Sequence, residues 1–74
     1  MAGFPANGNV YTTTRLNIRL GTPSTRVPIF QTVAAGTRLA YDKIVPNGES
    51  VNGNPVWLGD PNGNYFWSGA VQLV

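Results

Sequence analysis

Residues that favour turns recur along the whole chain, and they leave only short stretches in which regular structure can form. Nine Gly and six Pro are spread over 74 residues, and many of them gather in the stretches 21–28, 46–55 and 60–63. In the intervals between them, no window repeats apolar residues at i, i+3, i+4 and i+7 over two turns. Helix formers are scarce, with one Met, one Glu and one Lys. The sequence therefore predicts an all-β domain of short strands.

The clearest strand pattern runs over Tyr11–Leu20, where side chains of two kinds alternate. In an extended chain, successive side chains point to opposite faces of the sheet. One face is therefore expected to be buried, and its apolar members are Leu16, Ile18 and Leu20. The other face carries Arg15 and Arg19, whose charged groups are expected in solvent with their stems along the sheet.

Further strands are expected between the turns. They are predicted over Val27–Val33, Arg38–Val45, Val56–Leu58, Asn64–Trp67 and Val71–Val74. Two Asn-Gly pairs within Pro46–Pro55 are strong turn signals, and Gly36 is expected to take a positive φ in a tight turn. Ser68–Ala70 is expected to form one helical turn before the last strand. About five short strands at this spacing favour a small barrel, which hides most sheet edges.

The length allows one small domain with a modest core. A chain of this size buries only roughly 60% of the surface that it exposes when unfolded. Residues 1–10 are rich in Gly, Asn and Pro and are interpreted as a flexible lead-in. The barrel domain is expected to occupy residues 11–74.

The order of the segments resembles that of a known family. Leu-Asn-Ile-Arg at 16–19 is followed by Gly-Thr-Pro-Ser at 21–24, an apolar segment from Pro28, and a Gly-Thr turn at 36–37. This order is similar to the bacterial SH3 domain family, often called SH3b. The resemblance extends over residues 13–74 and implies an SH3-like barrel with a long first loop.

The second half of the chain also fits this family, with two departures. Trp57 stands where the family often carries a tryptophan, and Trp67 precedes the short turn and the closing apolar strand. The Asn-Gly-rich stretch at 46–55 is longer than usual, however, and the family's Gly-Trp near the end reads Tyr65-Phe66-Trp67 here. These departures fall on one side of the expected barrel and affect the transfer of a ligand site there.

Domains of this family usually accompany larger bacterial cell-wall enzymes or surface proteins. The resemblance therefore implies a non-catalytic binding or targeting module that contacts peptidoglycan or a short peptide. It also implies a secreted or cell-envelope location, as part of a larger bacterial protein. The alternative is a structural module that packs against and shapes a neighbouring hydrolase domain and has no ligand of its own.

The residues that catalysis commonly requires are few in this chain. There is no His and no Cys, so the usual general base and thiol chemistry are missing. Asp42, Glu49 and Asp60 are scattered along the sequence and are interpreted as surface charges rather than a catalytic pair or a metal site. We therefore predict no enzymatic activity, no metal and no cofactor.

Charge and hydropathy restrict the partners. A net charge of +2 falls short of the footprint of a nucleic-acid-binding domain, and no apolar run approaches the ~18 residues that span a bilayer. The first residues lack a basic segment followed by an apolar one, so no signal peptide is expected. The expected partners are a cell-wall peptide or glycan, or a neighbouring catalytic domain, with no nucleic acid and no membrane insertion.

Eight aromatic residues, two Trp, three Tyr and three Phe, are many for so small a core. The expected interior consists of Phe30 and Trp67 with Leu16, Ile18, Val33, Leu39 and Val71. The remaining candidates for a partly exposed binding surface are Tyr11, Tyr41, Trp57 and Tyr65, because flat rings with a polar end give contact area at low entropic cost. The alternative is that these four lie at the rim of the core with their polar ends in water.

Polar candidates lie around the first long loop, at residues 21–28. Asn17 either orders this loop through a hydrogen bond or contacts a ligand directly. Arg19 and Arg26 are either solvated or, if they approach each other across the loop, able to attract the carboxylates of cell-wall peptides. The full predicted ligand-binding set is Tyr11, Asn17, Arg19, Ser24, Arg26, Tyr41, Trp57 and Tyr65.

Overall fold

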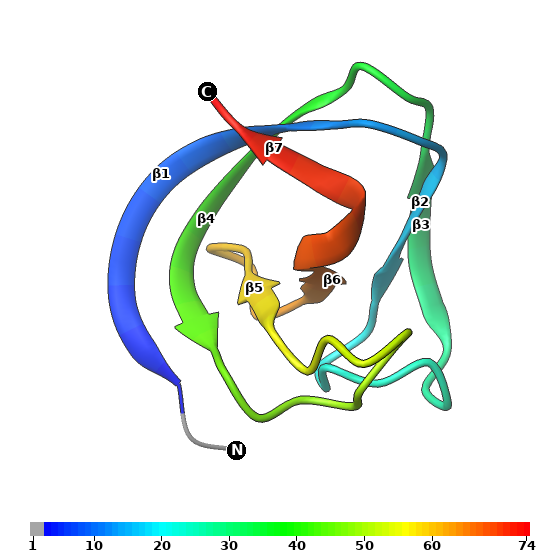
Figure 1. Ribbon diagram of the computed structural model, residues 1–74, viewed down its shortest axis with the longest axis vertical. Coiled ribbons are helices and arrows are strands. Elements are labelled where there is room, and N and C mark those ends of the chain that lie inside the picture. Colours follow the sequence, from blue (N-terminus) through cyan, green and yellow to red (C-terminus); the bar gives the residue numbers. More distant parts are fainter. Residues whose placement is uncertain (1–2) are drawn as a thin grey trace.

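The computed structural model describes residues 3–74, which form one antiparallel sheet of seven strands (Figure 1). The strands are β1 (Phe4–Thr12), β2 (Leu16–Arg19), β3 (Ile29–Val33), β4 (Arg38–Val45), β5 (Trp57–Gly59), β6 (Tyr65–Trp67) and β7 (Val71–Leu73). One 3₁₀ turn, η1 (Ser68–Ala70), precedes β7. The predictions of an all-β domain and of a helical turn at 68–70 are therefore confirmed.

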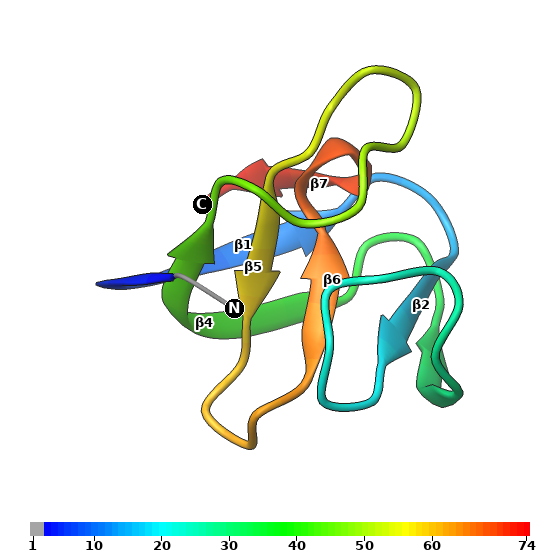
Figure 2. The same ribbon diagram turned by 90° about the horizontal axis from the view of Figure 1, so that it is seen from below.

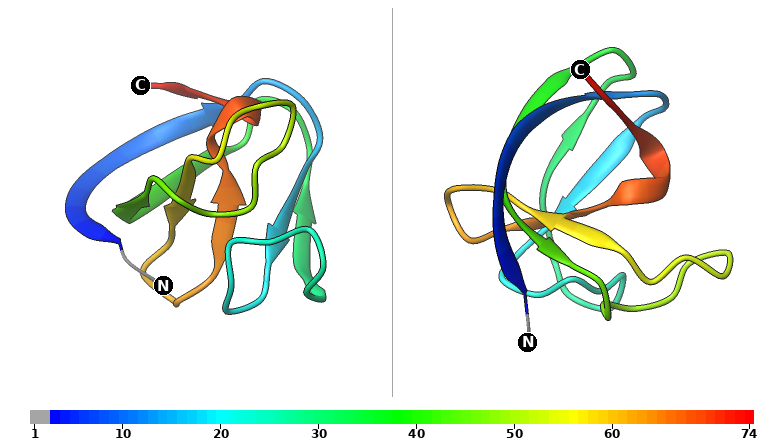
Figure 3. Two further views of the ribbon diagram at one scale, coloured as in Figure 1. Left: turned by 60° about the horizontal axis from the view of Figure 1, so that its bottom comes forward. Right: turned by 60° about the vertical axis from the view of Figure 1, so that its left-hand side comes forward.

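The sheet curls around a common interior but is not closed into a barrel (Figures 1 and 3). Its strand order is β3-β2-β6-β5-β4-β1-β7, so that β3 and β7 are its two edges. The prediction of a barrel of about five strands is therefore wrong in the number of strands, which is seven, and in the closure of the sheet. The sequence predicts six strand segments, and the seventh strand arises because the first of them is divided, with its beginning joined to the N-terminal segment in β1.

The N-terminal segment belongs to the sheet. Residues 4–12 form β1, which pairs with β4 (Val10 opposite Leu39) and with β7 (Val10 opposite Leu73). Val10 is fully buried and is part of the core. The interpretation of residues 1–10 as a lead-in is therefore wrong from Phe4 onward, because pairing with β4 along the segment, and with β7 from Val10, outweighs the weak strand preference of Gly, Asn and Pro.

The predicted strand over Tyr11–Leu20 is divided by a bend between β1 and β2. Buried Thr12 holds this bend, because its hydroxyl donates to the carbonyl of Ala34 at 2.8 Å and accepts from the amide of Thr37 at 2.9 Å. Leu16 and Ile18 are buried as predicted, whereas Leu20 lies beyond the end of β2 and is 48% exposed. The alternation in the sequence therefore predicts the face of β2 correctly but not its length.

The interior is filled by side chains from most of the strands. Its buried members are Val10, Leu16, Ile18, Leu58, Phe66 and Ala70. The predicted members Val33, Leu39, Trp67 and Val71 are partly buried and pack against this cluster. The prediction for Phe30 is wrong: it lies on edge strand β3, where its side chain is 51% exposed, and Phe66 fills the centre instead.

The turn predictions at Gly36 and at Asn52-Gly53 are accurate in backbone conformation, whereas Gly48 of the other Asn-Gly pair does not have a positive φ. Gly36 has a φ of +82° in the turn before β4, and β4 has the predicted bounds. Asn52 and Gly53 both have positive φ, and the flanking Val51 and Asn54 exchange backbone hydrogen bonds of 3.0 and 2.9 Å. This is the backbone that an Asn-Gly hairpin turn requires.

Candidate functional site

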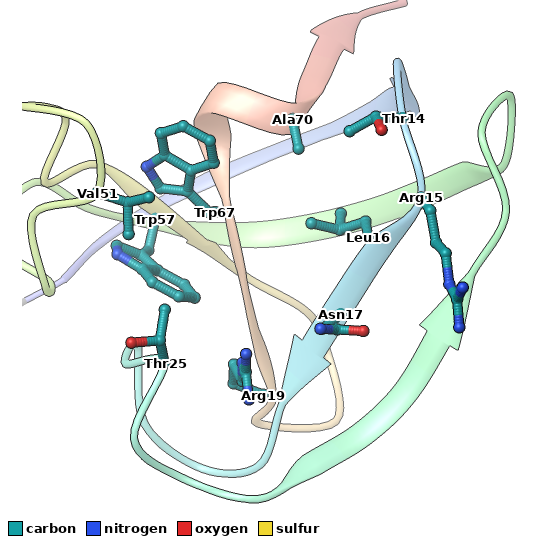
Figure 4. A pocket seen from close by; sticks show the side chains of 10 residues that line it. All are labelled: Thr14, Arg15, Leu16, Asn17, Arg19, Thr25, Val51, Trp57, Trp67 and Ala70. Carbon is teal, nitrogen blue, oxygen red and sulfur yellow. The ribbon is translucent and has the colours of Figure 1, made fainter.

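A pocket of about 230 Å³ opens where β2 and β6 diverge (Figure 4). The two strands share a single partner pair, Arg19 and Tyr65, so they separate toward the other end of β6, where Trp67 lies. The lining residues of the pocket are Thr14, Arg15, Leu16, Asn17, Arg19, Thr25, Val51, Trp57, Trp67 and Ala70. These residues come from the bend between β1 and β2, from β2, β5, β6 and η1, and from two loops. We call these the first loop (residues 20–28) and the second loop (residues 46–56).

Two tryptophans form one wall of the pocket. Trp57 and Trp67 are opposite each other on β5 and β6, and their side chains lie on the sheet face away from Leu58 and Phe66, because successive side chains alternate. The indole nitrogen of Trp57 donates to the carbonyl of Glu49 at 2.8 Å, and that of Trp67 donates to the carbonyl of Asn54 at 3.0 Å. Both rings are therefore fixed by the second loop.

Trp57 is only 1% exposed, so its prediction as a partly exposed surface residue is wrong. The second loop covers it, and in Figure 2 this loop crosses in front of β5 and β6. Gly48 permits the close approach, since a Cβ atom at that position would overlap Cδ1 of Trp57. Trp67 is half-buried, and it lines the pocket while packing against the interior.

The first and second loops are joined through Glu49. Its carboxylate accepts from the hydroxyl of Ser24 at 2.9 Å, from the amide of Thr25 at 3.0 Å and from the hydroxyl of Thr25. Its own amide donates to the carbonyl of buried Pro23 at 3.0 Å. The Thr25 and Ser24 hydroxyls favour the charged carboxylate and hold the pKa of Glu49 below its ordinary value, with Arg26 adding a smaller electrostatic effect.

The opposite wall of the pocket comes from β2. Asn17 accepts a hydrogen bond of 2.8 Å from the hydroxyl of Thr32 on β3, so the expectation that it orders the first loop is wrong. Arg19 has that role, because its Nη1 donates to the carbonyl of Val27 at 3.2 Å. The expectation that Arg19 is simply solvated is corrected as well, since it is half-buried.

Of the eight predicted ligand-binding residues, the pocket brings together Asn17, Arg19 and Trp57. Ser24 and Arg26 lie in the first loop outside its lining, where the hydroxyl of Ser24 accepts from the amide of Arg26 at 3.0 Å. Arg19 and Arg26 therefore do not converge on the pocket.

The three predicted tyrosines lie elsewhere in the sheet. Tyr11, which is 43% exposed, is on β1 opposite Gln72 of β7. Tyr41 is half-buried against the interior, and Tyr65 is half-buried with the ammonium of Lys43 5.8 Å from its ring centre. A groove formed by the four predicted aromatics is absent from the described residues.

Sequence reasoning missed Trp67, Thr25 and Val51 as pocket residues and Glu49 as the link between the loops. The unusual length of the stretch 46–55 was the available signal, because a loop longer than its turns require can fold over a neighbouring surface. Which surface it covers depends on contacts with the first loop, about 25 residues away in sequence, and no local pattern encodes such contacts.

The three carboxylates lie apart, and each has its own partner. Asp42 forms an ion pair of 3.0 Å with Lys43, Asp60 accepts from the amides of Asn62 and Asn64, and Glu49 joins the loops. Residues 3–74 contain no group of three or more acidic side chains that could hold a metal ion. The chemistry that the pocket offers is contact with aromatic rings together with hydrogen bonds from Asn17 and Arg19.

No family model, curated protein or solved structure matches this chain. In the part of the chain that the structure describes, no helix is long and apolar enough to cross a membrane. A functional conclusion must therefore come from the pocket and from the sequence.

Proposed function

We propose that this chain is a non-catalytic binding module that contacts bacterial cell-wall peptide or another short peptide through the pocket between β2 and β6. The single observation that carries the proposal is a pocket of about 230 Å³ in which half-buried Trp67, supported by buried Trp57, lies opposite Asn17 and Arg19. Rigid aromatic walls with a few convergent polar groups are typical of ligand sites. The module is part of a larger bacterial protein that is secreted or held in the cell envelope.

The proposal includes an architecture of the bacterial SH3 type. Support comes from the resemblance of residues 13–74, from the short antiparallel strands, and from the long loop that follows β2. The 3₁₀ turn before the last strand also agrees with that type. In this proposal the curled sheet is an opened relative of the SH3 barrel, and the second loop is a local addition that supports the pocket.

Retention on purified peptidoglycan tests the proposed function. Trp67→Ala removes one wall of the pocket, and we expect it to weaken binding by about tenfold or more. The fraction of the domain retained on peptidoglycan should fall accordingly. Tyr11→Ala is the matched control, because it removes an exposed aromatic ring on another part of the sheet, and its binding is expected to equal that of the wild type. The proposal is wrong if the wild-type domain is not retained, or if a folded Trp67→Ala variant is retained equally.

A second function is favoured by a different observation. Leu20, Ile29 and Phe30 are each about half exposed and belong to neighbouring backbone segments, since the amide of Leu20 donates to the carbonyl of Pro28 and β3 begins at Ile29. Adjacent exposed apolar side chains at a sheet edge suit contact with another domain. This surface supports the alternative of a structural module that packs against a neighbouring hydrolase.

Substitution in the full parent protein tests this alternative. Ile29→Thr together with Phe30→Ser makes the surface polar without changing the pocket, and the alternative predicts altered activity or substrate range of the attached enzyme. Unchanged enzyme activity and unchanged thermal stability of the parent would exclude a packing role for this surface.

A further inference from the structure

We infer that the pocket binds the carboxylate end of a short peptide, with the terminal carboxylate on Arg19 and Asn17 and the last side chain against Trp67 and Val51. This inference rests on the proposed binding function and names the chemical group that the site recognises. It depends on the two donors of β2, on the apolar wall opposite them, and on the size of the pocket.

The guanidinium of Arg19 is held in place but its charge is not paired. Its Nη1 donates to the carbonyl of Val27 at 3.2 Å, and the side chain is half-buried at the pocket. The ion pair between Lys43 and Asp42 is the only one within residues 3–74. A guanidinium that is already oriented by one backbone carbonyl keeps its remaining N–H groups for a carboxylate, which it binds through two parallel bonds.

The amide of Asn17 adds a donor beside it. Its oxygen accepts from the hydroxyl of Thr32, and Figure 4 shows the nitrogen on the side of the pocket and the oxygen toward β3. The described residues provide no acceptor for this nitrogen, whereas a carboxylate oxygen would satisfy it.

Three of the other donors that line the pocket are already engaged. The indole N–H groups of Trp57 and Trp67 donate to the second loop, and the hydroxyl of Thr25 donates to Glu49. Figure 4 shows the side chain of Arg15 extending toward β3, away from the tryptophans. A ligand is therefore oriented chiefly by the two β2 donors, and a group rich in acceptors fits them best.

Among the described residues, Glu49 is the carboxylate that is hydrogen-bonded to a residue of the pocket lining, Thr25. Its charge is countered by the hydrogen bonds from Ser24 and Thr25 and by Arg26. The lining itself contains two arginines and no acidic residue. The electrostatic balance of the pocket therefore favours an anion.

The dimensions and the apolar wall favour the end of a chain. A volume of about 230 Å³ is below the roughly 300–1,000 Å³ of pockets for drug-sized ligands. Val51 and Trp67, with the buried Trp57 behind them, offer an apolar surface opposite Arg19 (Figure 4). One side chain can occupy this surface while the adjoining carboxylate reaches β2.

The test compares two pools of randomised N-acetyl tripeptides, one with free C-terminal acids and one with C-terminal amides. Binding to the 74-residue domain is followed by tryptophan fluorescence. We expect the acid pool to bind at least tenfold more tightly than the amide pool, because a hydrogen-bonded ion pair replaces neutral contacts. Equal binding of the two pools, or no binding of the acid pool, would overturn the inference.

Two variants locate the recognition. Asn17→Asp keeps the oxygen that accepts from Thr32 but places a negative charge at the pocket, and Arg19→Gln removes the guanidinium. Both variants are expected to lose about tenfold or more in affinity for the acid pool and little for the amide pool. The control is Arg38→Gln, because Arg38 is an exposed residue of β4 outside the pocket lining. It is expected to change the affinity for neither pool. Acid preference that persists in both variants would contradict the assignment to β2.

Retention on peptidoglycan separates this inference from the proposed function. If Trp67→Ala abolishes retention while the two peptide pools bind equally, the binding function stands and the carboxylate specificity is wrong. If the wild-type domain is not retained but prefers the acid pool, the carboxylate site stands and the cell-wall ligand is wrong.

Discussion

The two faces of the sheet are stabilised in different ways. The interior cluster around Phe66 and Leu58 is apolar and is assembled from alternate residues of several strands. The opposite face, which we call the loop-covered face (Trp57, Trp67 and the first and second loops), is organised by hydrogen bonds of 2.8 to 3.0 Å from two indoles and around one carboxylate. Burial is equally complete at Trp57 and Phe66, each 1% exposed, but only on the loop-covered face do loops provide it.

This difference indicates a division of tasks. Removal of apolar surface from water is non-directional, so the interior can set the fold without fixing the loops. Hydrogen bonds are directional, and on the loop-covered face they fix the positions of Trp57 and Trp67 beside the pocket. Changes in the interior should therefore act on the whole domain, and changes on the loop-covered face should act mainly on the pocket.

The largest effect is expected for Phe66→Ala in the interior. The loss of a large buried ring costs about 3–5 kcal/mol, which approaches the total stability of a small domain, about 5–15 kcal/mol. Urea unfolding of this variant should show one transition at a much lower urea concentration than in the wild type. Fluorescence and circular dichroism should report the same transition. Phe30→Ala is the control, because this ring is 51% exposed on edge strand β3, and its effect is expected to stay within about 0.5 kcal/mol. Similar losses for the two variants would refute the assignment of the core.

A smaller and more local effect is expected for Gly48→Ala on the loop-covered face. The new Cβ atom would overlap Cδ1 of Trp57, so either the ring or the second loop must move, at a cost of about 1–3 kcal/mol. Tryptophan fluorescence should shift toward the red as Trp57 gains contact with water, while the circular dichroism of the sheet is retained. Ser50→Ala, an exposed substitution in the same loop, is the control. An unchanged emission spectrum in Gly48→Ala would show that the loop does not hold Trp57 tightly.

The interior could be predicted from the sequence to a large extent. Leu16 and Ile18 alternate with polar residues, and this pattern places both on the buried face of β2. The exposure of Phe30 could not be predicted in this way, because it follows from the position of β3 at the edge of the sheet. Residue type indicates that a ring can be buried, whereas strand order decides whether other strands are there to bury it.

The pocket could be predicted only in part. Asn17 and Arg19 were candidates because they belong to a strand beside a long loop, and they do line the pocket. The burial of Trp57 was missed, since it depends on contacts between the second loop and residues 23–25 of the first loop. Such contacts join segments that are distant in sequence, and neither turn residues nor alternation carries information about them.

The smallest effect on global stability, and the most specific for the loop-covered face, is expected from titration of Glu49. Because the hydroxyls of Thr25 and Ser24 lower the pKa of this carboxyl in the folded protein, its stabilising bonds are complete above the ordinary pKa of 4.5 and are lost as the pH falls through the lowered value. The amide resonance of Thr25 should therefore move at pH values below 4.5, while amides of the interior such as Leu58 stay unchanged. Glu49→Gln should abolish this titration and show the acid-like position of the Thr25 resonance at neutral pH. A Thr25 resonance that is unaffected by both acid and substitution would mean that contacts other than this carboxylate hold the two loops together. The loop-covered face would then not be organised around Glu49, and the proposed difference between the two faces would be wrong at this point.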